Sequence, residues 1–502
     1  MLIALSFAYL NLPIVIYLFS WIRFPFNLLN FLLVYTFYKL CRSKLVTMPL
    51  NKQKILISHV VYISFILFLY LLMTGHGGFL FTNGVDIPWR NAIYYDLISH
   101  SWPVIYEENG TALTYYLTFW LPAAGISSIL GLTNSQAQVV LFIWSFIGLL
   151  LVCLMLCNEV KANTCKENII STITFFFWSG MNLIGMILRS AAGKDRPFAI
   201  EDAPGFASWQ YSSWAHGGYF IGYFIRTTFD SIANVYNQFI PMALCTLLFL
   251  RFKKDYRFYA FIGLLALPYS PFGFIGLSLL MLGYFLCQLF KSKNRNEILV
   301  QVASIENLSA LISILPIYGF YYTANAVSVA SGNQSIFMAP LHAYTFVRVS
   351  NLILFYLLSF GVYLYLIRPK KSDAMLWIAA VLLCIFPFFK IGRGGDFLWN
   401  ASVAPYFFIM LTVIKHLLTI MRAKKVWGRD LLLIICLCIG MLTPIMQLSS
   451  SLGACALHKT HVLYLDPENV NGTFEGKDVI AYRNFLAVHY KNSFFYKYLA
   501  KD

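Results

Sequence analysis

The residues best suited to chemistry lie in a polar loop, residues 75–114, between two long apolar segments. Asp86, Arg90, Asp96 and His100 follow one another in this loop, and the first and last pairs are each four residues apart. A proline two residues after Asp86 fits the first turn of a helix, and side chains four residues apart share one helical face. A carboxylate or imidazole can take a proton from a hydroxyl, and a guanidinium can hold an anion. We therefore predict a short interfacial helix that carries catalytic groups.

Composition places this loop in a membrane protein. Hydrophobic residues make up 59% of the 502-residue chain and charged residues 12%, and the mean hydropathy is +0.68. Soluble domains average about 25% charged residues. We expect an all-α membrane protein, a polytopic bundle of roughly 13–15 transmembrane helices, with a large first external loop that carries interfacial helices.

Apolar runs bounded by charges or turn residues define the candidate spans. They are residues 2–20, 26–40, 55–73, 114–132, 137–157, 169–188, 217–229, 236–250, 259–267, 273–290, 308–322, 352–367, 375–389, 405–418 and 431–448. Between residues 114 and 236 the number of crossings stays open, because either the 217–229 segment spans the membrane or an earlier segment lies in the interface. We expect residues 1–448 to form the bundle and residues 449–502 a small external tail.

Basic clusters abut these runs and predict the orientation. They are Arg42/Lys44/Lys52/Lys54, Arg251/Lys253/Lys254/Arg257, Lys291/Lys293/Arg295, Arg368/Lys370/Lys371 and Arg422/Lys424/Lys425. Short cytoplasmic loops collect Lys and Arg, so the net charge of +16 does not indicate nucleic-acid binding. With the clusters inside, residues 75–114, 268–272, 323–348, 390–400 and the tail lie outside, on the periplasmic face of a bacterial inner membrane or in a lumen.

Two later segments add candidate residues on the outer side. Arg393 and Asp396 flank a Gly-Gly pair, whose backbone amides can approach an anion. Asn237 and Gln238 precede a proline and are candidate contacts for an acceptor. The ten cysteines show no CxxC metal site, and His458 and His461, three residues apart near Cys455, lack a fourth ligand. No cofactor is therefore required, and a divalent metal ion is left open.

Each candidate also has a structural interpretation. Asp86 is placed to cap a helix, and Arg90 to extend to lipid headgroups. Asp96 and His100 could pair to orient the loop, and Arg393 and Asp396 could pair around their turn. Glu107 and Glu108 are typical of a solvated turn. A polar helix cap would explain Asn237 and Gln238.

The chain resembles the GT-C superfamily of polytopic glycosyltransferases, which includes protein O-mannosyltransferases and aminoarabinose transferases of lipid A. The resemblance rests on an acidic residue in a first large external loop, an amphipathic helix, a Trp-Pro pair and the start of the next span. Shorter similarities to an uncharacterised bacterial branch extend along the chain. The residues that carry the resemblance are Tyr115-Tyr-Leu, Trp120-Leu-Pro, Gly131-Leu, Trp178-Ser-Gly-Met-Asn182, residues 236–241, Arg393-Gly-Gly-Asp396-Phe, residues 401–405 and Phe494-Phe-Tyr-Lys-Tyr. The chain departs from that branch at Trp399 and Asn400, where the branch carries an arginine.

The resemblance implies a GT-C-like fold and a sugar donor linked to polyprenyl phosphate, which enters from the bilayer. A glycan, lipid or protein acceptor arrives from the aqueous side. Asp86 and Asp96 are the expected catalytic acids, with Asp86 as the base. The expected substrate contacts are Arg90, His100, Tyr115, Asn237, Gln238, Arg393 and Asp396.

Other classes of function remain open. A transporter or lipid flippase would use charges inside the membrane, whereas most charges here cluster in the outer loops. An O-antigen polymerase or ligase would be expected to have a late outer loop rich in Arg and His. A non-catalytic assembly subunit is the remaining alternative if Asp86 is inert.

Overall fold

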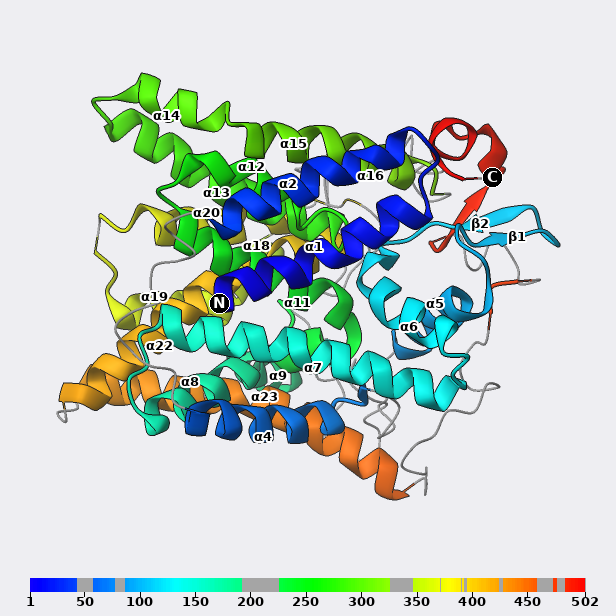
Figure 1. Cartoon of the computed structure of the whole chain (residues 1–502). Coiled ribbons are helices and arrows are strands. Elements are labelled where there is room, and N and C mark those ends of the chain that lie inside the picture. The colour runs from blue at the N-terminus through cyan, green and yellow to red at the C-terminus, as the bar shows by residue number, and fades with distance from the viewer. Residues whose placement is uncertain are drawn as a thin grey trace.

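The computed structural model is a bundle of helices with one small sheet at an end (Figure 1). It describes residues 1–42, 57–76, 86–191, 225–325, 346–370, 372–389, 391, 395–423, 428–457, 473–475 and 484–501. The expectation of an all-α membrane protein is confirmed at this level, because helices dominate and several are long and apolar enough to cross a bilayer.

Six helices of the described residues meet the length and hydropathy of a membrane span. They are α1 (Leu2–Ser20), α7 (Asn134–Glu159), α11 (Thr228–Phe252), α13 (Pro271–Lys291), α22 (Val403–Ala423) and α23 (Gly428–Leu457). A seventh candidate is a pair bent by 41°, which joins α14 (Arg295–Val302) to α15 (Ile305–Ser313) and α16 (Leu315–Thr323). The larger predicted number of spans stays a prediction.

Shorter helices complete the bundle. Those within apolar stretches are α2 (Leu29–Cys41), α4 (Ile57–Met73), α6 (Leu121–Ile129), α18 (Phe346–Tyr356), α19 (Val362–Ile367) and α20 (Ala374–Ile385). The others are α5 (Ile87–Ser99), α8 (Cys165–Phe176), α9 (Asn182–Ala191), α12 (Tyr259–Leu264) and α21 (Asp396–Ala401).

The outer helices expose apolar side chains, as lipid contact requires. Leu12 on α1, Phe65 on α4, Ile143 on α7 and Leu282 on α13 are each about half exposed. In water such surfaces would be unfavourable, whereas in a bilayer they meet hydrocarbon. These helices therefore form the lipid-facing shell.

Helix α11 lies at the centre, and its span is wholly buried. Thr227 caps it by accepting a hydrogen bond from the Asp230 amide at 3.0 Å. Non-helical torsions at Val235 interrupt the helix six residues before Pro241. The sequence suggested separate segments at 217–229 and 236–250, and the second begins directly after this interruption. Residues 217–224 of the first segment lie outside the described residues. The polar stretch before Val235 is helical because its side chains bond within the same segment: Asp230 accepts from Arg226 and Asn234, and Ser231 donates to the Thr227 carbonyl.

A three-stranded antiparallel sheet closes one end of the bundle. Strand β1 (Ile105–Tyr106) pairs with β2 (Thr111–Leu113), and β2 pairs with β3 (Leu486–Val488) near the C-terminus. Gly110 has a φ of 61° in the β1–β2 turn, a conformation that glycine adopts without strain. Glu107 and Glu108 are exposed in the same turn, as expected.

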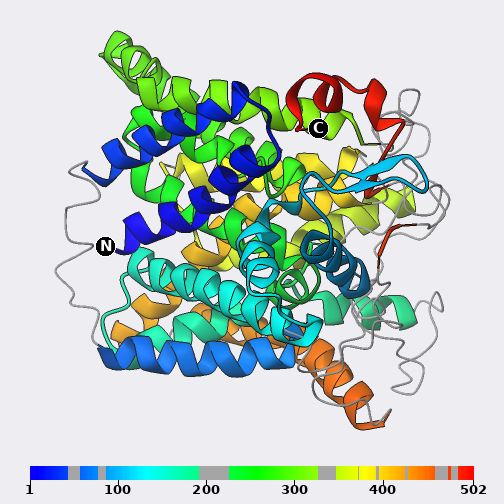
Figure 2. The same ribbon diagram turned by 45° about the vertical axis from the view of Figure 1, so that its right-hand side comes forward.

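The C-terminal residues lie against the first part of the chain (Figure 1 and Figure 2). Ala500 forms a β-bridge with Ile22 and accepts a hydrogen bond from the Arg23 side chain at 2.6 Å. Phe495 packs its ring against Tyr321 of α16. The C-terminal residues thus pack beside the end of α1, whereas the N-terminus lies at the other end of that helix (Figure 1).

Basic segments and the polar loop lie at opposite ends of the helices. In Figure 1, α14 and the neighbouring ends of α22 and α23 are at the left, whereas α5, the sheet and the C-terminus are at the right. Among the described residues, these elements are therefore separated as the charge pattern predicts.

The basic end is held by an ion pair between Glu167 of α8 and Arg422 of α22. The guanidinium donates to both carboxylate oxygens, at 2.9 and 2.8 Å, and also to the carbonyl of Lys161. These hydrogen bonds lower the pKa of Glu167 from 4.5 to about 2. Because the pKa is lowered on folding, the carboxylate stabilises the fold above about pH 4.5, and the effect is lost as the pH falls toward 2.

We predict that Glu167→Gln lowers the free energy of unfolding at pH 7 by about 1 kcal/mol, since the pair is partly exposed. The midpoint of thermal unfolding in detergent should fall by about 1 °C. The difference from the unmodified protein should shrink between pH 5 and pH 3. Glu297→Gln, on exposed α14, is the control and should change little. A pH-independent difference would contradict the assignment.

Candidate functional site

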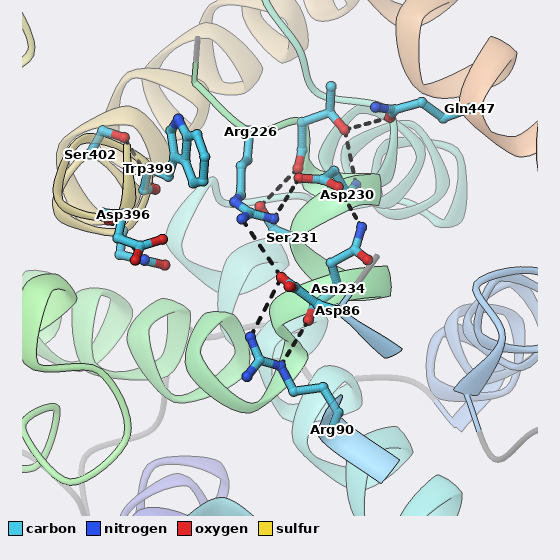
Figure 3. A network of polar contacts seen from close by, with 12 residues as sticks. Asp86, Arg90, Arg226, Asp230, Ser231, Asn234, Asp396, Trp399, Ser402 and Gln447 are labelled. Atoms are coloured by element: carbon cyan, nitrogen blue, oxygen red, sulfur yellow. Dashed lines mark hydrogen bonds and ion pairs between the residues drawn. The ribbon is translucent and has the colours of Figure 1, made fainter. Parts of the chain in front are cut away.

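Asp86 stands directly before helix α5 and points into the bundle. It occupies the N-cap position, yet its side chain makes no capping hydrogen bond. Its carboxylate oxygen Oδ2 lies 3.5 Å from Nη2 of Arg90 and 3.9 Å from Nη2 of Arg226 (Figure 3). The side chain is 31% exposed. The carboxylate is therefore turned toward two cations and remains accessible, which the capping interpretation does not explain.

Arg90 is buried one turn into α5. Its Nη1 donates to the hydroxyl of Tyr115, and its Nε donates to the carbonyl of Asn234 at 3.3 Å. The guanidinium also lies over the Tyr115 ring, 5.2 Å from the centroid. Only 5% of the side chain is exposed, so Arg90 does not extend to lipid headgroups. It links α5 to α11.

Arg226 enters the site just before α11. Its Nη1 lies 3.0 Å from Oδ2 of Asp230, one turn further along the helix. Asp230 also accepts a hydrogen bond from the Asn234 amide at 2.6 Å. The side chains of Arg226 and Asp230 are 10% and 2% exposed. A buried pair needs such additional hydrogen bonds to offset its desolvation.

Two further elements surround this pair (Figure 3). The Arg226 guanidinium lies 5.1 Å from the ring centroid of Trp399 on α21. On the other side, the hydroxyl of Thr227 donates to Oε1 of Gln447 on α23 at 2.8 Å. Helices α5, α11, α21 and α23 thus converge on one polar site.

The electrostatics of the site favour charged arginines. Burial alone lowers the pKa of Arg226, but the nearby carboxylates of Asp230, Asp86 and Asp396 together outweigh it and raise the pKa. Burial likewise opposes the charge of Arg90, and Tyr115 and Asp86 more than compensate. Both guanidinium groups therefore remain cationic at any physiological pH.

The structure brings together four of the predicted residues, Asp86, Arg90, Tyr115 and Asp396. Asp396 begins α21 and lies on the Trp399 side of Arg226 in Figure 3. It also raises the pKa of Tyr116, after burial and Tyr115. The predicted Arg393 lies outside the described residues, and so do His458 and His461.

Asp96 and His100 lie at the other end of α5 and make different contacts. Asp96 is fully buried, and its Oδ2 accepts hydrogen bonds from the Tyr106 hydroxyl at 2.6 Å and the Phe474 amide at 3.1 Å. Burial raises the pKa of Asp96, and these hydrogen bonds oppose the rise. His100 contacts Glu475 at 3.4 Å. These contacts tie the loop to the C-terminal segment, and a catalytic role for Asp96 stays a prediction.

Asn237 and Gln238 lie deeper along α11, beyond the interruption at Val235. Gln238 accepts a hydrogen bond from Ser270 at 2.9 Å. Asn237 is fully buried, and neither polar atom of its amide has a hydrogen-bond partner within the described part of the chain. Both residues belong to the buried core and not to a helix cap.

Sequence reasoning missed Arg226 and Asp230. Arg226, Asp230 and Asn234 recur every four residues, which places them on one helical face. That regular spacing of polar side chains was the available signal. Among the residues that the structure describes, no group of three or more His, Cys, Asp or Glu side chains is arranged to hold a metal ion.

Comparisons with models of protein families, with curated proteins and with solved structures found no match.

We predict that Asp230→Asn destabilises the protein by about 3 kcal/mol, because it leaves the buried Arg226 without its closest counter-charge. Thermal unfolding monitored by tryptophan fluorescence measures the loss. The matched control is Asp255→Asn, which breaks an ion pair of 2.6 Å with Arg257, a residue that is 51% exposed. That variant should lose less than about 1 kcal/mol. Equal losses would show that the buried Arg226–Asp230 pair stabilises the protein no more than the exposed pair does.

Proposed function

We propose that this protein is an integral-membrane glycosyltransferase of the GT-C type. It would move a sugar from a polyprenyl-phosphate donor to an acceptor at the outer end of the bundle. No cofactor is part of the proposal, and a divalent metal ion stays open.

The proposal rests on the environment of the Asp86 carboxylate. It is partly exposed, makes no capping hydrogen bond and faces two buried arginines from separate segments. A carboxylate that only stabilised the fold would be expected to sit in short hydrogen bonds, as Asp230 does. Asp86 thus combines access to substrate with cations close by.

In the proposed reaction, Asp86 accepts the proton of an acceptor hydroxyl as the oxygen attacks the anomeric carbon. The bond between that carbon and the phosphate oxygen breaks, and its electron pair leaves with the polyprenyl phosphate. Configuration at the anomeric carbon is inverted. Positive charge beside the leaving phosphate stabilises the transition state.

The surroundings suit substrates of this kind. The bundle exposes apolar helices to lipid, so a polyprenyl chain can remain in the bilayer. The acceptor, a glycan, lipid or protein, would approach from the aqueous side where the sheet lies. We assign that side to the periplasm of a bacterium, by the positions of the basic clusters.

A transporter or lipid flippase is the second candidate, and α11 favours it. This helix is buried throughout, is interrupted at Val235, and carries Asp230, Asn234 and Asn237. Interrupted helices with buried polar groups form the substrate sites of many transporters. The two candidates predict different products, since only the enzyme transfers the sugar.

We predict that Asp86→Asn lowers turnover of radiolabelled polyprenyl-phosphate sugars by at least about 100-fold, because the amide cannot accept the proton. The measurement is transfer of label by the purified protein to an acceptor mixture. Glu107→Gln, in the exposed β1–β2 turn, is the control and should leave turnover unchanged.

Equal turnover by the unmodified protein and Asp86→Asn would exclude Asp86 as the base. Absence of transfer with every donor, together with movement of the intact donor across liposome membranes, would replace the enzyme by the transporter.

A further inference from the structure

Two guanidinium groups converge on a single oxygen. Nη2 of Arg90 and Nη2 of Arg226 both face Oδ2 of Asp86, at 3.5 and 3.9 Å (Figure 3). Such a convergence of two cations is the arrangement that binds a phosphate oxygen. A carboxylate of the protein itself occupies this position.

The arginines are fixed by other partners. Asp230 and the Trp399 ring hold Arg226, while Tyr115 and the Asn234 carbonyl hold Arg90. These contacts do not involve Asp86. Removal of its carboxylate from between the arginines would therefore leave both guanidinium groups in place.

Asp86 is the most weakly held member of the group. Its contacts of 3.5 and 3.9 Å exceed the range of about 2.7–2.9 Å for hydrogen bonds between charged groups. It is 31% exposed, against 5% and 10% for the arginines. A ligand with better geometry can thus replace it.

Arg226 also has an unused donor. Its Nε is buried and has no hydrogen-bond partner in the part of the chain that the structure describes. A buried donor without an acceptor is unfavourable, and a phosphate has several oxygens that can accept from it. A single carboxylate oxygen at the distances seen here does not satisfy this group.

We propose that Arg90 and Arg226 form a subsite for the phosphate group of a lipid phosphate, and that the Asp86 side chain occupies this subsite when it is empty. An incoming phosphate takes both arginines and releases Asp86. The charge balance of the buried site is kept, because one anion replaces another. If the proposed transferase function holds, the released carboxylate is then free to act as the base.

Competition between Asp86 and the ligand gives a test that does not depend on turnover. Binding of farnesyl phosphate to the purified full-length protein in detergent would be measured by isothermal titration calorimetry. Asp86→Asn should bind it about tenfold more tightly than the unmodified protein, because the neutral amide competes poorly for the arginines. Asp86→Ala should change affinity in the same direction. Arg226→Gln should weaken binding about tenfold or more in either background.

Further measurements test which part of the ligand is recognised and provide a control variant. Farnesol lacks the phosphate and should not bind detectably, and inorganic pyrophosphate shows whether phosphate suffices without the lipid. Glu107→Gln should bind farnesyl phosphate with the affinity of the unmodified protein. Size-exclusion chromatography establishes that each variant is folded.

The proposal is overturned if Asp86→Asn binds farnesyl phosphate no more tightly than the unmodified protein, or if Arg226→Gln binds it equally well. Binding of farnesol with the same affinity, or no binding of farnesyl phosphate by any variant, would overturn it too. If the protein transfers no sugar but shows the predicted order of affinities, the phosphate subsite stands and the transferase function falls.

Discussion

The buried ion pair between Arg226 and Asp230 is the interaction on which the centre of the structure depends. Removal of two charges from water is costly, and attraction between them compensates only when further hydrogen bonds satisfy both groups. Asn234 and the Thr227 cap contribute to that compensation, and both belong to the first turns of α11. A central helix that carries charge is therefore stable only when its own residues and the surrounding helices supply hydrogen-bond partners for the charged side chains.

This requirement also determines what packs on α11. Arg90 of α5 donates to the carbonyl of Asn234, immediately before the interruption at Val235. The polar helix α5 thus reaches a backbone group of the central span. The site forms where α5 and the buried helix α11 share hydrogen bonds, which explains how the partly exposed carboxylate of Asp86 lies next to buried arginines.

The C-terminal segment stabilises the same loop from outside. Phe485 packs its ring against Tyr115 and Trp89, and Phe474 stacks on Phe485. Asp96 joins α5 to residues 473–475 through the Phe474 amide. Phe485 and Phe474, near the C-terminus, therefore help to position Tyr115, and through it Arg90. The tail is part of the scaffold of the site.

The sequence by itself determined the class of an all-α membrane protein, since hydropathy follows from residue type; α1 has the bounds expected for the first candidate span. It also marked Asp86 and Arg90, because charges stand out in an apolar chain. Only the tertiary structure decided that Asp86 faces Arg226, that Asp96 is bound to Tyr106 and Phe474, and that residues 228–234 form a helical segment that continues beyond Val235 into the central span. Those contacts join residues far apart in the chain, and their energies depend on burial and distance, which local patterns do not encode.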